Sequence, residues 1–325
     1  MVVGCMGKNI PDVSNIKVDL QVQRFEDDLF AIDTLHVDSS LQILQKKYPL
    51  FTQDFVFNIL ALPAQPDSAL VVNNNIVAFI SSYQSLKVSA KLKFSDIQAI
   101  EKDVKKALQF VRFYFPEYKL PTKLITFVGP VNSYANILTA DALAVGLQLY
   151  LGNEYPLYNS VAFEEIYPSY ISRRFSKEYV AVNCIKTITD DMFPDKSAGK
   201  PLIEQMIQAG KKLYLLDQLM PEVPDTIKTG YSQMQLEGCI DNERAIWSFF
   251  ARNELLFNTD PSITRDYMND APSTQVFGKE SPGFIGQFVG WQIIKKWVKK
   301  NDEKTLAQIM NTNPKLIFEE AKYKP

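Results

Sequence analysis

The stretch "LIEQMIQAGKKLYLLDQLMP", residues 202–221, has the spacing of a helix that buries at least one face. Its apolar stripe consists of Leu202, Met206, Ile207, Leu213 and Leu216. Gly210 lies in the middle of the stretch, where glycine costs about 1 kcal/mol relative to alanine. The sequence therefore predicts a central helix whose glycine either admits a neighbouring backbone or belongs to a functional site.

Composition and charge narrow the class of protein. Of the 325 residues, 46% are hydrophobic and 22% are charged, which is the ordinary balance of a globular protein with a large core. The chain has 35 basic and 37 acidic residues, and its formal net charge is −2. Because no surplus of positive charge is available to neutralise a phosphate backbone, we expect no nucleic-acid partner.

The chain contains one histidine, His36. A metalloprotease helix with the H-E-x-x-H motif needs two histidines on one face, so this chain cannot form that site. The cysteines are Cys5, Cys184 and Cys239, and no C-x-x-C pair occurs, which excludes a zinc ribbon and a thioredoxin-type motif. Cys184 and Cys239 either form a disulfide or are two buried free thiols.

The first residues, "VVGC" at 2–5, fit a bacterial lipobox in which Cys5 carries the lipid. A signal peptide needs an apolar stretch of roughly 7–15 residues before that site, and only four residues precede Cys5. Either the numbering starts too far downstream or the match is accidental. Residues 1–15 are predicted to be a flexible tether. The longest apolar run, 284–294, is too short for a membrane span and indicates a buried helix.

Candidate strands and helices are segregated along the chain. Strands are predicted within 16–30, over 121–131 and over 142–152, whereas residues 32–62 form two helical pieces. A long amphipathic helix is expected from an N-cap at Ser95 to Pro116, and from residue 197 onward the pattern is almost wholly helical. This segregation predicts the α+β class, with a small sheet in the N-terminal half and a mostly helical C-terminal half. We expect residues 16–325 to form one domain.

Two further segments carry candidate chemistry. In "ESPGFIGQFVGWQIIKKWVKK", residues 280–300, Ser281 and Pro282 are predicted to start a helix. Its glycines do not follow the pattern of a phosphate-binding loop, so they favour close helix packing. The segment 231–257 supplies the carboxylates Glu237, Asp241, Glu243 and Glu254. Of these, Glu243 is expected to point inward, because its neighbours are apolar.

The order of motifs along the chain resembles a known family. The motifs are "VGLQLYLGNEYPLY" (145–158), "MIQAGKKLYLLDQLMP" (206–221), "GYSQMQLEGCIDNERAIWSFF" (230–250), "APSTQVFGKESPGFIGQFVGWQIIKKWV" (271–298) and "AKYKP" (321–325). Together they resemble the gliding motility-associated lipoprotein GldB family from about residue 15 to the last residue. The resemblance implies a cell-envelope lipoprotein that faces the periplasm, is anchored through a lipid on Cys5 and acts in gliding motility with the type IX secretion apparatus.

GldB-type proteins in turn resemble zincin-like proteases, which carry H-E-x-x-H on the helix that matches 202–219. The metal-binding and catalytic positions would fall near Met206, Ile207 and Gly210, beside Lys211, and Glu243 would be the downstream acid. Because zinc catalysis needs three protein ligands and an activated water, this set implies a pseudo-protease without a metal or other cofactor. The five residues are predicted to line a vestigial cleft.

Three functions follow from these observations. The first is a non-catalytic, zincin-like scaffold that binds other envelope proteins of gliding motility or type IX secretion. The second is a hydrolase or peptidase that works without a metal, through carboxylates such as Glu237 and Glu243. The third is an envelope lipoprotein that senses a small ligand in the cleft.

Overall fold

The computed structural model describes residues 10–65 and 68–325 and divides into two compact units. Of the described residues, the sheet unit comprises those within Val18–Lys106 and Lys119–Ile188, and the helical unit comprises 10–17, Ala107–Tyr118 and Thr189–Pro325. Two of the four boundaries between them fall within helices, α5 (Gln98–Tyr114) and α8 (Val180–Met192). The single domain expected for residues 16–325 stays a prediction.

A four-stranded mixed sheet is the centre of the sheet unit. Its strands are β1 (Gln21–Arg24), β2 (Lys123–Phe127), β3 (Asn136–Leu138) and β4 (Ala142–Gly146), in the order β1-β2-β4-β3. The β1–β2 and β2–β4 pairs are parallel, and β3 runs antiparallel to β4. Nearly every residue of β2 and β4 is buried, as expected for central strands that are covered on both faces.

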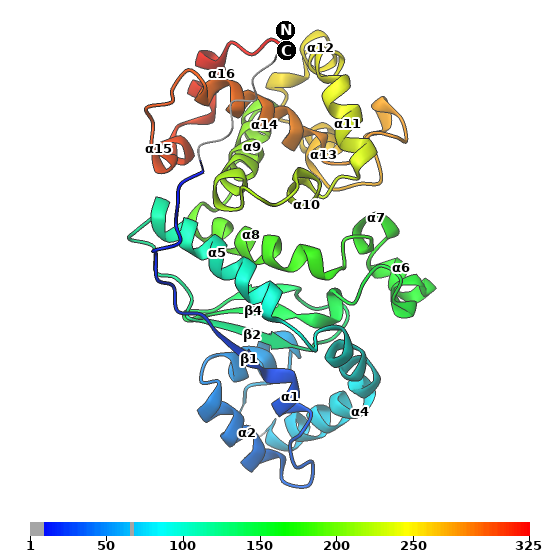
Figure 1. Ribbon diagram of the computed structural model, residues 1–325. Coiled ribbons are helices and arrows are strands. Elements are labelled where there is room, and N and C mark those ends of the chain that lie inside the picture. Colours follow the sequence, from blue (N-terminus) through cyan, green and yellow to red (C-terminus); the bar gives the residue numbers. More distant parts are fainter. Residues whose placement is uncertain (1–9, 66–67) are drawn as a thin grey trace. The chain divides into compact units, whose positions relative to one another are not determined.

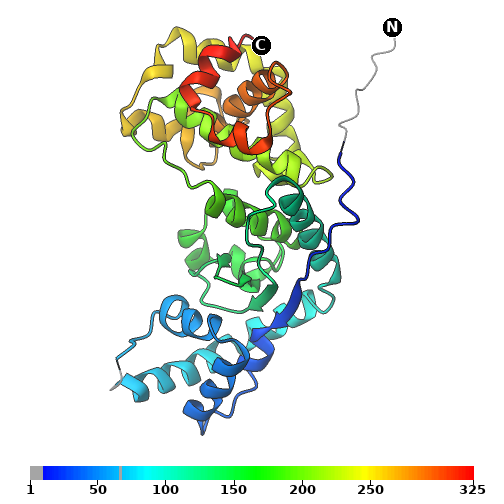
Figure 2. The same ribbon diagram turned by 90° about the vertical axis from the view of Figure 1, so that its left-hand side faces the viewer.

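Helices cover the sheet, as Figure 1 shows. This unit also contains α1 (Phe25–Leu29), α2 (Val37–Lys47), α3 (Phe51–Gln53), a π-helix (Asp54–Ile59), α4 (Ala69–Lys93), α6 (Val161–Ile166) and α7 (Ser169–Ser172). Three short 3-10 helices complete the described elements of the unit: Leu147–Leu149, Pro156–Asn159 and Lys177–Tyr179. Figure 2 shows the long α4 in the same unit as the shorter α1 and α2.

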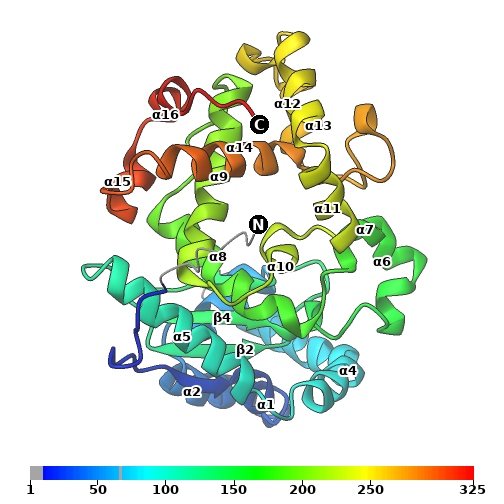
Figure 3. The ribbon, with the colours of Figure 1, turned by 45° about the horizontal axis from the view of Figure 1, so that its top comes forward.

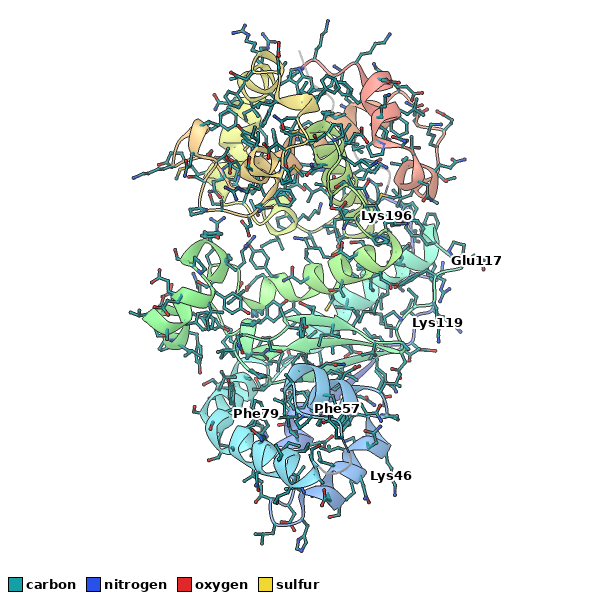
Figure 4. The ribbon with its side chains drawn as sticks, turned by 180° about the vertical axis from the view of Figure 1, so that it is seen from behind. Lys46, Phe57, Phe79, Glu117, Lys119 and Lys196 are labelled. Atoms are coloured by element: carbon teal, nitrogen blue, oxygen red, sulfur yellow. The ribbon has the colours of Figure 1, made fainter. Side chains whose placement is uncertain are left out.

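One face of the sheet packs against a cluster of aromatic rings. Ile125, Phe127, Ala142 and Ala144 supply the sheet side of this core. The buried rings on the helical side are Phe25, Tyr48, Phe51, Phe55 and Phe79. Phe25 meets Phe51 edge to face, with ring centroids 4.9 Å apart, a geometry that aromatic pairs prefer. Figure 4 labels Phe79, a buried member of the cluster on α4, and Phe57, which is exposed.

The helical unit is built around two long helices, α9 (Leu202–Leu219) and α14 (Ile285–Val298), which cross in contact as seen in Figure 3. Around them lie α10 (Asp225–Thr229), α11 (Gln233–Asp241), α12 (Glu243–Arg252), α13 (Pro261–Met268), α15 (Leu306–Asn311) and α16 (Pro314–Ala321). Two 3-10 turns, Leu255–Phe257 and Gln275–Phe277, complete the described elements of this unit.

These elements confirm the α+β class, with the sheet in the N-terminal half and helices in the C-terminal half. Three local predictions were wrong. The strand expected over 142–152 ends at Gly146, after which the chain turns into a 3-10 helix. The helix expected to begin at Ser281 and Pro282 begins at Ile285, because Ser281 directs its hydroxyl to carbonyls of the preceding loop. The helix assigned a Ser95 cap starts at Gln98, whose N–H bonds to Asp96.

Candidate functional site on helix α9

Helix α9 has clear boundaries in the sequence. Pro201 precedes it in an extended conformation, and proline fits the start of a helix because it has no N–H to leave unpaired. Met220 donates its N–H to the carbonyl of Leu216, and Pro221 follows, where the chain cannot continue as helix. The helix is therefore one continuous element that carries four of the five predicted site residues.

Gly210 lies against the backbone of α14. A Cβ atom added at Gly210 would lie 2.1 Å from the carbonyl carbon of Gly290, far inside any allowed contact. The contact is reciprocal, because a Cβ added at Gly290 would lie 1.6 Å from the carbonyl oxygen of Met206. The interpretation of these glycines as sites of close helix packing is confirmed, and the helical cost of Gly210 is offset by the contact it allows.

The predicted cleft is filled at this position. Met206 and Ile207 are each 0% exposed, and the backbone of α14 at Gly290 occupies the space in front of them. The vestigial cleft predicted from the sequence is therefore closed at Met206, Ile207 and Gly210. The physical reason is that small residues on both helices bring the two backbones together, so no room is left for a peptide or a ligand between them.

Lys211 extends away from that contact. Its side chain is 2% exposed, and its ammonium donates to the carbonyls of Met310, at 3.1 Å, and of Thr312. These carbonyls lie at the C-terminal end of α15, where unpaired carbonyl groups and the helix dipole attract a cation. Burial lowers the pKa of Lys211 from its ordinary value near 10.5 to about 8. Lys211 also lines a cavity of about 420 Å³.

Glu243 has a different environment. It is the first residue of α12, it is partly exposed, and its carboxylate accepts a hydrogen bond from the hydroxyl of Tyr323. Burial, together with this hydrogen bond, raises the pKa of Tyr323, so the phenol remains a neutral donor. The structure thus brings Met206, Ile207 and Gly210 together, turns Lys211 to another face of α9, and pairs Glu243 with the C-terminal segment.

The other residues that the sequence singled out are His36 and the three cysteines. His36 is exposed in the sheet unit, with its Nδ1 atom 2.7 Å from a carboxylate oxygen of Asp33. Within residues 10–65 and 68–325, no cluster of three His, Cys, Asp or Glu side chains is arranged to hold a metal ion. Cys184 and Cys239 are free and buried, which excludes the disulfide alternative. Cys5 lies outside the described residues.

Sequence reasoning missed a buried ion pair beside this site. Asp217 of α9 accepts from the ammonium of Lys228 at 2.9 Å and from the indole N–H of Trp291 at 2.7 Å. Both charged side chains are 1% exposed, and Asp225 gives Lys228 a second carboxylate contact. The signal in the sequence was an aspartate within an apolar helical stripe, but nothing local identifies its partner eleven residues later.

The fold and the α9 site together describe an α+β protein whose central helix packs glycine to glycine and carries no histidine. Over residues 6–325 the sequence matches the family described as gliding motility protein GldB, and the chain belongs to this family. Membership implies a gliding motility lipoprotein of the cell envelope that is anchored to a membrane. No helix in the part of the chain that the structure describes is both long and apolar enough to cross a bilayer. No curated protein and no solved structure matched the chain.

Proposed function

We propose that this protein is a non-catalytic scaffold of the gliding apparatus, with a zincin-like fold and a lipid on Cys5. It faces the periplasm and binds other envelope proteins of gliding motility or type IX secretion. Support comes from the family match and, above all, from the packing of α9. Where a zincin helix would present its metal-binding side chains, Met206, Ile207 and Gly210 are packed against α14.

The alternative of a carboxylate-based hydrolase is less well supported. Of its two candidate acids, Glu237 is exposed and accepts a hydrogen bond from Gln233 of the same helix, at 2.7 Å. Glu243 is paired with Tyr323. Neither carboxylate is fully buried, and each already accepts a hydrogen bond from another side chain.

A substitution tested in the native cell distinguishes the scaffold function from the hydrolase function. Glu243→Gln keeps the size of the side chain and its ability to accept from Tyr323, but it removes the ionisable carboxyl group. A scaffold does not use the ionisable group, so we expect gliding speed to stay within about twofold of wild type. A factor of about two corresponds to less than about 1 kcal/mol. Loss of gliding with normal protein level and unchanged crosslinking to partners would favour the hydrolase.

Zinc binding to the purified full-length protein provides an independent check. The scaffold predicts no stoichiometric, high-affinity zinc binding by isothermal titration calorimetry at pH 7. A one-to-one complex that resists dialysis would refute it. The lipid anchor is checked separately by mass spectrometry of the protein from its own membrane, where an unmodified Cys5 behind a retained Met1 would contradict the proposal.

A further inference from the structure

The cavity beside Lys211 carries an excess of positive charge. It is formed within the helical unit by the segment 192–200, by α9 and by the turn between α15 and α16. Its volume is about 420 Å³. The charged side chains that line it are Lys196, Lys200, Lys211 and Glu204. With all four ionised, the lining has a formal charge of +2, which is unusual in a protein whose net charge is −2.

Lys211 is the buried member of the three lysines that line the cavity. Two carbonyl oxygens, those of Met310 and Thr312, accept from its ammonium. Since an ammonium has three N–H donors, one remains for a ligand in the cavity. A polar side chain that is 2% exposed and still has a donor to offer is suited to bind a group that enters the cavity.

Lys196 and Lys200 are the two exposed lysines of the cavity lining. Both lie in the segment between α8 and α9, where Figure 4 labels Lys196. Neither has a carboxylate partner among the described residues, so their charges are not neutralised within the protein. Among the described residues that line the cavity, Glu204 is the only carboxylate, and it leaves the excess at two positive charges.

The chemistry of the lining indicates the kind of anion. All three cations are lysines, whose ammonium groups bind phosphate as point charges. A phosphate monoester carries about −1.5 to −2 charges at pH 7, which matches the formal charge of the lining. Ser197, Gln208 and Asn313 provide further hydrogen-bonding groups around the cavity.

We propose that this cavity binds a phosphomonoester group, which takes the remaining N–H donor of Lys211 and ion pairs with Lys196 and Lys200. The group belongs either to a small soluble phosphate ester or to a lipid headgroup of the phosphatidic acid type. This inference is independent of the scaffold role, because it concerns a different face of α9 from the one packed on α14.

The test uses the purified full-length protein and inorganic phosphate as the probe, with chloride at the same ionic strength as reference. The key variant is Lys196→Gln with Lys200→Gln, which leaves the buried Lys211 in place. The matched control is Lys279→Gln with Lys299→Gln, which removes two exposed lysines of the same unit from outside the cavity. Both pairs change the net charge equally, so a difference between them reports the site.

Calorimetry is expected to show saturable binding of phosphate at pH 7 with a stoichiometry of one. The cavity variant should weaken it about tenfold, and the control should change it by less than about twofold. The proposal is overturned if phosphate and chloride give the same response, or if the two double variants bind phosphate equally.

A second measurement identifies the source of the phosphate. Vesicles of phosphatidylcholine, with or without phosphatidic acid, are mixed with the protein in competition with glycerol 3-phosphate. Binding that needs phosphatidic acid and is displaced by glycerol 3-phosphate supports a lipid headgroup. Retained binding of glycerol 3-phosphate without vesicle binding supports a soluble ester. Binding of neither ligand contradicts the proposal.

Discussion

At the scale of single residues, Lys211 couples stability to pH. Its pKa is lowered to about 8 in the folded protein, and it returns to about 10.5 on unfolding. Between these two pKa values, Lys211 binds more protons in the unfolded chain than in the folded protein. Its contribution to the free energy of unfolding therefore rises with pH. From about pH 8 to 9.5 the gain is about 1.5 kcal/mol.

The corresponding prediction compares wild type with Lys211→Met by urea denaturation at several pH values. The variant should lack the gain between about pH 8 and 9.5, because methionine has no proton to lose. Cys184 and Cys239, whose pKa values burial raises to about 12, contribute equally to both proteins and cancel in the difference. Parallel curves for the two proteins would show that Lys211 keeps its ordinary pKa.

The buried pair of Asp217 and Lys228 gives a second prediction at this scale. Asp217→Asn should lower the free energy of unfolding by about 3 kcal/mol, because it leaves the ammonium of Lys228 in the core with less neutralising charge. The control is Asp190→Asn, which breaks an exposed pair with Lys212 and should cost less than about 1 kcal/mol. Equal losses from the two substitutions would contradict this role of burial.

At the scale of elements, the crossing of α9 and α14 is the contact on which the helical unit depends. Two glycines allow it, and each is opposed by backbone that cannot rotate away as a side chain can. The hydrophobic faces of the two helices then bury Met206 and Ile207 of α9 and Phe288 and Trp291 of α14. Burial of apolar area of this kind is the main stabilising term in folding.

Replacing either glycine with alanine tests this contact. Gly210→Ala and Gly290→Ala should each destabilise the protein by about 3 kcal/mol or more, because the added methyl group overlaps backbone. Gly238→Ala, in α11, is the matched control, since nothing lies within 4 Å of its added Cβ. It should stabilise by about 0.5–1 kcal/mol through better helix propensity. Thermal unfolding followed by circular dichroism measures the stability of all three variants. A small loss of stability in Gly210→Ala would show that the two helices can move apart without cost.

At the scale of the whole molecule, two compact units have separate probes of unfolding. The three tryptophans, Trp247, Trp291 and Trp297, all belong to the helical unit. Cys184 is a buried free thiol of the sheet unit, and Cys239 is one of the helical unit. Fluorescence and thiol labelling therefore report the two units individually in one chain.

With these probes, Gly290→Ala is expected to lower the urea midpoint of tryptophan fluorescence and of Cys239 labelling more than that of Cys184 labelling. The reason is that the substitution disrupts a contact inside the helical unit, whereas the sheet unit has its own aromatic core. Identical shifts at both thiols would instead support the single domain that the sequence predicted for residues 16–325.

The sequence by itself determined the fold class, because strand and helix periodicities are segregated along the chain and can be read locally. It left two roles open for Gly210, a close backbone approach or a functional site, and it excluded a zinc site built on two histidines. It assigned nothing to residues 69–93, which form α4, because apolar residues such as Leu70 and Val72 lie on both the exposed and the buried side of this helix. Without a stripe of one polarity, a helix gives no periodic signal.

Only the tertiary structure decided what lies against α9. The closure of the expected cleft by α14, the pairing of Asp217 with Lys228 and Trp291, and the cavity beside Lys211 all join segments far apart in the chain. The physical reason is that local patterns fix which face of a helix is apolar, whereas packing between distant segments fixes which neighbour covers it. A buried charge, a glycine contact and a cavity are properties of that neighbour as much as of the residue itself.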